Sequence, residues 1–262
     1  MTSDSPVRLT DASVAYAGRT VLDGITLEIA AGERVAVIGP SGAGKTTLFR
    51  LIAGLVKPVR GEVQTLGFDT RDLRGRKLAA LRRELGFLQQ QDNLIPQLRV
   101  VHNVLMGRLG RWWLPRALLS LLWPQQIELA RAALARVELA ERLWSLPDEL
   151  SGGQQQRVAV ARLIVQQSRL VLADEPVSAL DLRLGREIIG LLTELATRDG
   201  VTLLVNLHTL DLLQGNFDCV IALRDGKLFW QGRPEALTQA LLRELYGAEY
   251  RALHLDEIVL PA

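Results

Sequence analysis

One stretch of the sequence indicates the fold most directly. It is Val35-Ala36-Val37-Ile38, followed at once by Gly39-Pro40-Ser41-Gly42-Ala43-Gly44-Lys45-Thr46-Thr47. Four consecutive apolar residues are typical of a strand that is buried on both faces of a parallel sheet. The first eight of the nine residues after them match the pattern G-x-x-x-x-G-K-[ST], which forms a phosphate-binding loop between a strand and a helix. The sequence therefore predicts a central strand, a phosphate loop and a helix that begins near Gly44.

Each part of this loop has a chemical reason. Glycine lacks a Cβ atom and tolerates positive φ, so backbone N–H groups can approach phosphate oxygens closely. The helix after the loop adds its unpaired N–H groups and the positive end of its dipole. Lys45 can reach the β- and γ-phosphates of ATP, and the hydroxyl of Thr46 is a hard ligand for Mg²⁺. The candidate nucleotide-binding residues are Gly39, Pro40, Ser41, Gly42, Ala43, Gly44, Lys45, Thr46 and Thr47.

A second apolar run, Leu170-Val171-Leu172-Ala173, ends in the adjacent carboxylates Asp174 and Glu175. Successive strand residues point to opposite sides, so the two acids can serve two roles. Open α/β sheets bind ligands at the carboxyl ends of their strands, where this pair and the phosphate loop would both lie. We expect Asp174 to hold Mg²⁺ through water and Glu175 to polarise the attacking water as a catalytic residue.

Composition narrows the class of protein. The chain has 262 residues, 48% of them hydrophobic, with a formal net charge of +2 and a single cysteine, Cys219. The single cysteine excludes an internal disulfide, and the first residues lack the basic and apolar regions of a signal peptide. No stretch approaches the ~18 apolar residues of a membrane-spanning helix. These features indicate a cytoplasmic chain, and the near-balanced charge argues against nucleic acid as a partner.

Apolar runs alternate with helical stretches, which predicts an α/β fold with a largely parallel sheet. Early strands are expected over Val7–Tyr16 and Thr26–Ala30, and a later one over Val201–Val205. A helical block runs from about Arg99 to Gln167, and Asp225-Gly226 has the chemistry of a hairpin turn. The predicted layout is one nucleotide-binding core with an inserted helical lobe.

Leu150-Ser151-Gly152-Gly153-Gln154-Gln155-Gln156-Arg157 resembles the signature motif of the ATP-binding-cassette ATPases and precedes the acidic strand, as in that family. Such a motif can form a second anion site. Its serine supplies a hydroxyl, its two glycines leave their backbone N–H groups accessible, and the helix that follows adds the positive end of its dipole. The resemblance implies two copies of the chain packed head to tail. Ser151, Gly152, Gly153 and Gln154 of one copy would then close over the γ-phosphate held by the other.

Other family motifs occur in the same order. The resemblance implies that Tyr16 stacks on adenine and that Gln90 contacts both Mg²⁺ and the transporter. Three consecutive glutamines leave that register open by one residue, and Asn93-Leu94 favours Gln90. Asp181 would contact the opposite subunit, although Leu182 replaces the proline that commonly follows. His208 would be the switch histidine that contacts the γ-phosphate together with Lys45, whereas His102 and His254 match no motif and are expected to be structural or surface residues.

The resemblance extends over residues 7 to about 247. It implies a P-loop NTPase fold, with a RecA-like core, an antiparallel N-terminal β subdomain and an inserted helical subdomain. We expect residues 1–250 to form the nucleotide-binding domain, residues 95–167 its helical subdomain, and residues 251–262 a tail.

Segments outside the shared motifs look most similar to the ATPases of phosphonate importers, among them Asn103–Gly110 and Leu245-Tyr246-Gly247. This likeness implies separate permease subunits, a periplasmic or lipid-anchored solute-binding protein and a place on the cytoplasmic face of the inner membrane. The cargo would be a phosphonate, phosphite or phosphate. The alternatives are a transporter for another substrate, or a soluble cassette protein without a membrane partner.

The tryptophan-rich stretch Arg111–Pro124 has two open interpretations. It contains Trp112, Trp113 and Trp123 together with several leucines. It could belong to the core, or it could form an exposed apolar patch that docks against the permease or lies near the bilayer. Such a patch would account for part of the positive mean hydropathy of +0.14.

Overall fold

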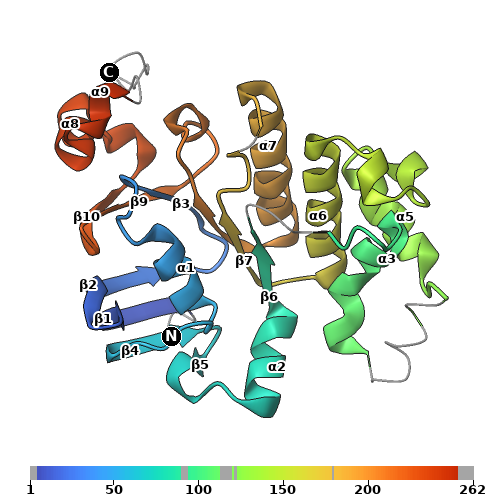
Figure 1. Cartoon of the computed structure of the whole chain (residues 1–262), viewed down its shortest axis with the longest axis horizontal. Helices are drawn as coiled ribbons and strands as arrows, with labels where there is room; N and C mark the ends of the chain where they lie inside the picture. The colour runs from blue at the N-terminus through green and yellow to red at the C-terminus, as the bar shows by residue number, and fades with distance from the viewer. Residues whose placement is uncertain (1–4, 90–93, 113–119, 121–122, 179, 253–262) are drawn as a thin grey trace.

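The computed structural model describes residues 5–89, 94–112, 120, 123–178 and 180–252 (Figure 1). Its centre is a six-stranded sheet in the order β10-β9-β3-β8-β7-β6. The strands are β3 (Arg34–Ile38), β6 (Leu85–Leu88), β7 (Leu170–Asp174), β8 (Thr202–Asn206), β9 (Cys219–Arg224) and β10 (Lys227–Gly232). All neighbours pair in parallel except β9 and β10, which confirms the predicted sheet.

The exception is the predicted hairpin. β9 and β10 pair antiparallel across Asp225 and Gly226, whose φ angles are 50° and 75°. Two successive residues with positive φ match the right-handed twist of the flanking strands, which explains the Asp-Gly pair at this turn.

A smaller antiparallel sheet covers one side of the molecule. Its order is β2-β1-β4-β5, built from β1 (Val7–Tyr16), β2 (Arg19–Ile29), β4 (Arg60–Thr65) and β5 (Phe68–Asp69). The strand expected over Thr26–Ala30 is the second half of the longer β2, which begins directly after the turn that ends β1. This sheet agrees with the predicted antiparallel N-terminal region.

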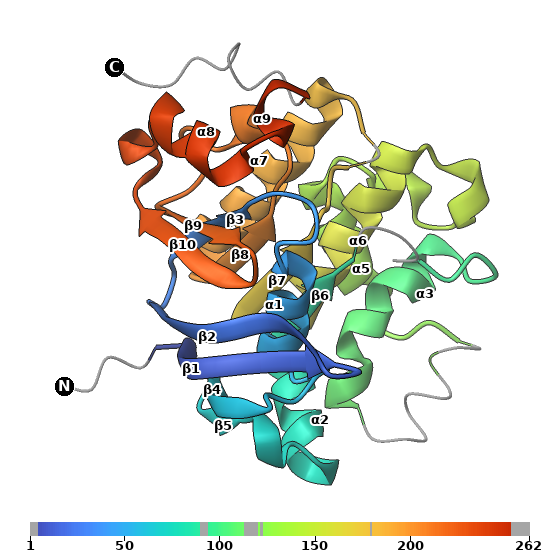
Figure 2. The ribbon, with the colours of Figure 1, turned by 60° about the vertical axis from the view of Figure 1, so that its left-hand side comes forward.

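Two hydrophobic cores lie on the two faces of the parallel sheet. Val35 and Val37 face the core that contains helix α1 (Lys45–Ile52), while Ala36 and Ile38 face the other core. Successive strand side chains point to opposite faces, so a run without polar residues is needed when both faces are covered. Figure 2 shows α1 between the antiparallel sheet and the parallel one.

The remaining helices are placed around this frame. α3 (Val100–Leu105), α5 (Ile127–Arg136) and α6 (Gly152–Gln166) lie together beyond the β6 edge of the sheet (Figure 1). They begin and end within one residue of the helical block predicted over Arg99–Gln167, although the division of the chain into subdomains stays a prediction. The others are α2 (Gly75–Glu84), α7 (Leu182–Asp199), α8 (Gln239–Tyr246) and α9 (Glu249–Ala252), with single-turn 3₁₀ segments η1 (Thr70–Asp72), η3 (Ala140–Arg142), η4 (Pro147–Glu149), η5 (Leu210–Leu212) and η6 (Pro234–Ala236) and the longer η2 (Met106–Arg111).

None of the helices in the described part of the chain combines the length and the hydropathy that crossing a bilayer requires.

Candidate nucleotide-binding site

The phosphate loop leaves the carboxyl end of β3 and enters α1 at Lys45, with Gly44 as the N-cap. Gly39 has a φ of +145°, and a Cβ atom placed there would lie 2.1 Å from the carbonyl oxygen of Leu223. The loop therefore passes β9 so closely that only glycine fits at this position. It encloses a cavity of about 300 Å³ that is lined by Val21, Ser41, Gly42, Ala43, Gly44, Lys45, Thr46, Thr47, Glu175 and His208.

Lys45 lies at the base of the loop. Its side chain is buried, and Nζ donates hydrogen bonds to the carbonyl oxygens of Gly39 at 2.6 Å and Pro40 at 3.0 Å. Burial lowers the pKa of Lys45, while the nearby carboxylates Glu175, Glu249 and Asp174 oppose that effect. The lysine is thus positioned as a cation that would gain from an anionic ligand.

Oxygen donors converge at the ends of α1 and β7. Thr46 Oγ1 donates to Asp174 Oδ1 at 3.3 Å, and Asp174 is itself 9% exposed. Mg²⁺ in nucleotide sites takes one or two protein oxygens and completes its shell with phosphates and water. A threonine hydroxyl next to a carboxylate at the edge of the phosphate cavity fits that requirement.

Asn206 is a site residue that the sequence analysis missed. It lies beside Asp174 in the parallel register of β7 and β8, and its Nδ2 donates to Asp174 Oδ1 at 2.7 Å. Asn206 is fully buried, and its Oδ1 has no hydrogen-bond partner among the described residues. The available signal was its place at the end of an apolar run adjacent to the acidic strand.

Glu175 and His208 meet at the cavity. Glu175 Oε1 and His208 Nε2 are 2.6 Å apart, although 33 residues separate them in the chain. Glu175 has a φ of 52°, a left-handed conformation that is unfavourable for a non-glycine residue and that recurs at functional sites. The two side chains that were expected to act on the γ-phosphate and on water are therefore brought together.

Several of the expected residues do not line this cavity or lie outside the described residues. Tyr16, at the end of β1, is 43% exposed and does not line it. Gln90 lies outside the described residues, as does His254. His102 has a structural contact, because its Nδ1 lies 3.3 Å from the carbonyl oxygen of Ser120.

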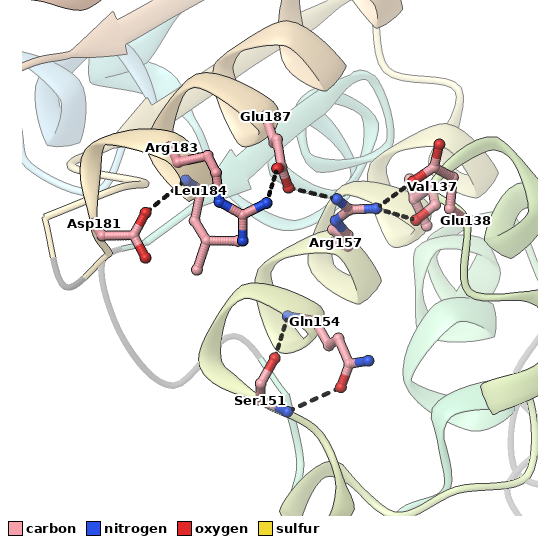
Figure 3. A network of polar contacts seen from close by, with 9 residues as sticks. All are labelled: Val137, Glu138, Ser151, Gln154, Arg157, Asp181, Arg183, Leu184 and Glu187. Atoms are coloured by element: carbon pink, nitrogen blue, oxygen red, sulfur yellow. Dashed lines mark hydrogen bonds and ion pairs between the residues drawn. The ribbon is translucent and has the colours of Figure 1, made fainter.

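The signature motif forms the start of α6, away from the cavity. Ser151 is the N-cap, and its Oγ accepts a hydrogen bond from the backbone N–H of Gln154 at 3.3 Å (Figure 3). Gln154 Oε1 accepts in return from the N–H of Ser151 at 3.0 Å, which completes a capping box. Ser151 and Gly152 are exposed, so this helix start is open to a ligand from outside the chain.

Arg157, one turn further along α6, connects three helices. Its guanidinium donates to Glu187 of α7 at 2.6 Å and, beyond the end of α5, to Glu138 at 2.9 Å (Figure 3). Asp181 caps α7 by accepting from the N–H of Leu184 at 2.9 Å. Leu182 is the first residue of this helix, a position that suits proline but does not require it.

The fold and this cavity define a P-loop nucleotide hydrolase, in which a glycine-rich loop, a buried lysine and an acidic strand end surround a phosphate site. Residues 22–178 match the family model described as ABC transporter. The chain therefore belongs to the ABC transporter family and is an ATPase that binds and hydrolyses ATP.

Curated relatives match nearly the whole chain. The phosphonates import ATP-binding protein PhnC of Pseudomonas putida is 42% identical over 95% of this chain and 93% of its own length. The corresponding protein PhnC 1 of Cupriavidus necator is 45% identical over 92% of this chain and 87% of its own.

Solved structures agree with the fold. A dimeric post-hydrolysis state of the ATP-binding cassette MJ0796, bound to ADP and phosphate, is 34% identical with a TM-score of 0.73 over 87% of this chain and 98% of its own. The protein cbiO1 of Clostridium perfringens, part of the ABC transporter complex cbiONQ, is 26% identical with a TM-score of 0.78 over 97% of this chain and all of its own.

Proposed function

We propose that the chain is the ATP-hydrolysing subunit of a bacterial importer for phosphonate or a related phosphorus oxyanion such as phosphite or phosphate. The observation that carries this proposal is the identity of 42–45% with phosphonate-import ATP-binding proteins over nearly the full length of both chains. We expect the nucleotide site to bind ATP and not the cargo, so the choice of cargo rests on that similarity.

In this proposal two copies of the chain form a head-to-tail dimer with two ATP molecules at its interface. The exposed start of α6 supports it, because Ser151 and Gly152 belong to an anion site that the chain's own phosphate cavity does not use. The dimeric state of the MJ0796 cassette supports it as well. Separate transmembrane permease subunits and a periplasmic or lipid-anchored solute-binding protein complete the importer, and the ATPase lies on the cytoplasmic face of the inner membrane.

The proposed domain organisation rests on the same family pattern. Residues 1–250 form the nucleotide-binding domain, residues 95–167 its helical subdomain and residues 251–262 a tail. Closure of the dimer draws the helical subdomains together and moves the permease between its inward- and outward-facing states.

Each site residue has a proposed chemical role. The loop amides and Lys45 bind the phosphates, and Lys45 and His208 stabilise negative charge that develops on the γ-phosphate. Glu175 accepts a proton from the attacking water as it lines up with the phosphorus. Thr46, Asp174 through water, and Gln90 would hold Mg²⁺, which neutralises phosphate charge when bound. Tyr16 contacts adenine, and Asp181 contacts the partner subunit.

Replacing Glu175 by glutamine tests the catalytic assignment. Glutamine keeps the shape and polarity of the side chain but cannot accept the proton, so turnover should fall by ~10²-fold or more while ATP binding persists. Steady-state phosphate release and ATP titration measure the two effects, and light scattering should detect a dimer that ATP stabilises. Normal phosphate release by this variant would refute the role of Glu175.

The cargo is tested separately with the complete complex in liposomes. Methylphosphonate, phosphite and phosphate are added in turn, and at least one should stimulate ATP hydrolysis in the presence of the solute-binding protein. Stimulation by an amino acid or a sugar alone would reject the phosphonate class and leave the ATPase assignment intact. Nucleic acid or ribosomes in place of a permease among the co-purified components would instead favour the soluble cassette alternative.

A further inference from the structure

The C-terminal helices α8 and α9 lie against the phosphate loop, and the proposed nucleotide chemistry does not use them. α8 is fixed to the core by its buried residues Leu242, Leu245 and Tyr246. Arg224 of β9 also donates a hydrogen bond of 2.6 Å to the carbonyl oxygen of Glu244. α8 is therefore a docked part of the fold, and it holds the start of α9 at a defined place beside the loop.

Tyr246 extends from α8 toward the start of the phosphate loop. It is 5% exposed, and its hydroxyl lies beside the Gly39 backbone without forming a regular hydrogen bond to any described residue. Burial raises the pKa of Tyr246 to about 12, an effect that the Gly39 backbone opposes only in part. Tyr246 therefore places a buried hydroxyl next to the first glycine of the loop, and α8 lies close to the phosphate loop at this point.

Glu249 reaches the loop itself. Its Oε2 accepts a hydrogen bond from the backbone N–H of Ser41 at 3.3 Å, and its charge acts on Lys45 more strongly than that of Asp174 does. Its position is constrained on both sides. Gly247 turns the chain with a φ of 52°, and Tyr250 is buried beneath the guanidinium of Arg243, 5.5 Å from the ring centre.

We propose that Glu249 is a residue that sets nucleotide affinity, because its carboxylate takes a loop amide and a position near Lys45 that the phosphates of ATP also require. A carboxylate and a phosphate are both anionic acceptors, so the two compete for the same donors and repel one another. ATP binds only after Glu249 has withdrawn, and its affinity is reduced by the fraction of molecules in which the carboxylate occupies the loop. The position of the Glu249 side chain thereby depends on the nucleotide. The inference rests on ATP binding and is independent of the cargo.

Glu249→Gln tests the proposal with little change in shape. In EDTA, which prevents hydrolysis, equilibrium titration of the full chain should show ATP binding about three- to tenfold tighter than in the wild type. Glu249→Asp retracts the carboxylate by one methylene and should give a smaller gain in the same direction. Adenosine, which carries no phosphate, should bind both proteins equally.

Glu244→Gln is the matched control, because Glu244 is an exposed acid on α8 and is not one of the carboxylates whose charge acts on Lys45. It removes the same charge from the same region and should leave ATP affinity unchanged. An equal gain in this control, or a gain for adenosine, would show a general effect of charge and overturn the proposal. Unchanged or weaker ATP binding by Glu249→Gln would also overturn it.

Discussion

Asn206 holds the carboxylate of Asp174 in place from the neighbouring strand. Its amide donates to the same oxygen, Oδ1, that accepts from Thr46, so it orients the acid toward the threonine hydroxyl. Residues that orient metal ligands commonly change metal affinity by one to two orders of magnitude when they are removed. We therefore expect Asn206 to influence the site through its hydrogen bond to Asp174.

The variant Asn206→Ala should raise the Mg²⁺ concentration for half-maximal ATPase activity by about tenfold, because Asp174 loses its fixed orientation. ATPase rates measured across a Mg²⁺ titration at saturating ATP provide the readout. Asn216→Ala serves as the control, since Asn216 donates to the carbonyl oxygen of Leu212 outside the site. A Mg²⁺ dependence equal to that of the wild type would show that Asn206 is only a core residue.

Among the elements, α5, α6 and α7 are joined through Arg157. Both of its carboxylate partners raise the pKa of Arg157, and the hydrogen bond to Glu138 is the largest cause. The Glu138 side chain is 81% exposed, however, whereas Glu187 is 32% exposed and closer. Water screens the exposed carboxylate, so the contact with Glu187 should contribute more to stability.

A double-mutant cycle tests this ranking. Arg157→Met combined with Glu187→Gln should give a coupling energy of about 1 kcal/mol, and the same cycle with Glu138→Gln about 0–0.5 kcal/mol. Urea unfolding of the nucleotide-free chain measures each corner of both cycles. Equal couplings, or a larger one for Glu138, would contradict the ranking.

An ion pair holds the N-terminal end of β3, the strand that leads into the phosphate loop. Arg34 of β3 donates through Nε at 2.9 Å and Nη2 at 2.5 Å to the two oxygens of Asp218, which also accepts from the Arg34 backbone N–H. The Arg34 side chain holds the pKa of Asp218 below its ordinary value of 3.8. A lowered pKa means that the folded state binds fewer protons here than the unfolded state does.

This pair should therefore stabilise the fold fully above pH 3.8, and its contribution should disappear as the pH falls through the lower pKa of the folded state. The Asp218 side chain is 45% exposed, so screening limits the effect to about 1 kcal/mol or less. Urea unfolding of Asp218→Asn should show that difference at pH 7, and the difference should shrink steadily as the pH is lowered below 3.8. Asp211→Asn, at an exposed aspartate, is the control. If Asp218→Asn lost as much unfolding free energy in acid as at pH 7, the proposed dependence on protonation of Asp218 would be wrong.

Elements with a strong sequence pattern could be predicted, and those without one could not. The apolar runs at β3, β7 and β8 and the Asp-Gly hairpin were recognisable because both faces of those strands are covered and the turn needs positive φ. α2 was not predicted, since Leu81 is its only buried residue and its apolar face is correspondingly weak. β5 has only two residues, too few for any alternation to appear.

At the site, the loop and the acidic pair could be identified because their chemistry fixes residue types at fixed spacing. Asn206 and Glu249 could not, because each acts through a contact between residues far apart in the chain. The pairing of Asp174 with Asn206 depends on strand order, and that of Ser41 with Glu249 spans 208 residues. Asn206 has only its place at the end of an apolar run to mark it, and Glu249 has no comparable signal in the sequence.

On the scale of the whole molecule, large exposed hydrophobic side chains gather in one part of the chain. Of the eight that are exposed among the described residues, four lie between β6 and α6, namely Ile95, Trp123, Trp144 and Leu146. The tryptophan-rich stretch divides accordingly. Trp112 packs against the core, Trp123 is 76% exposed, and Trp113 lies outside the described residues. Trp112 therefore fits the core interpretation and Trp123 has the exposure that the docking interpretation requires, while docking itself stays a prediction.

The exposed tryptophan is the better candidate for contact with a permease. Tryptophan side chains at the centre of an interface often contribute about 2 kcal/mol or more to binding, so Trp123→Ser should weaken association with the transmembrane subunits by roughly tenfold or more. Its exposure predicts a change in unfolding free energy within about 0.5 kcal/mol. Trp112→Ser should behave in the opposite way and lose about 1–3 kcal/mol of stability through lost packing. Urea unfolding and surface-immobilised binding of the detergent-solubilised permease separate the two effects, with Val59→Ser as an exposed hydrophobic control on the loop before β4. If the Trp123 variant bound the permease with wild-type affinity, the contact would have to lie on another surface. Trp123 is largely exposed, so loss of its side chain should affect permease binding and not the stability of the fold.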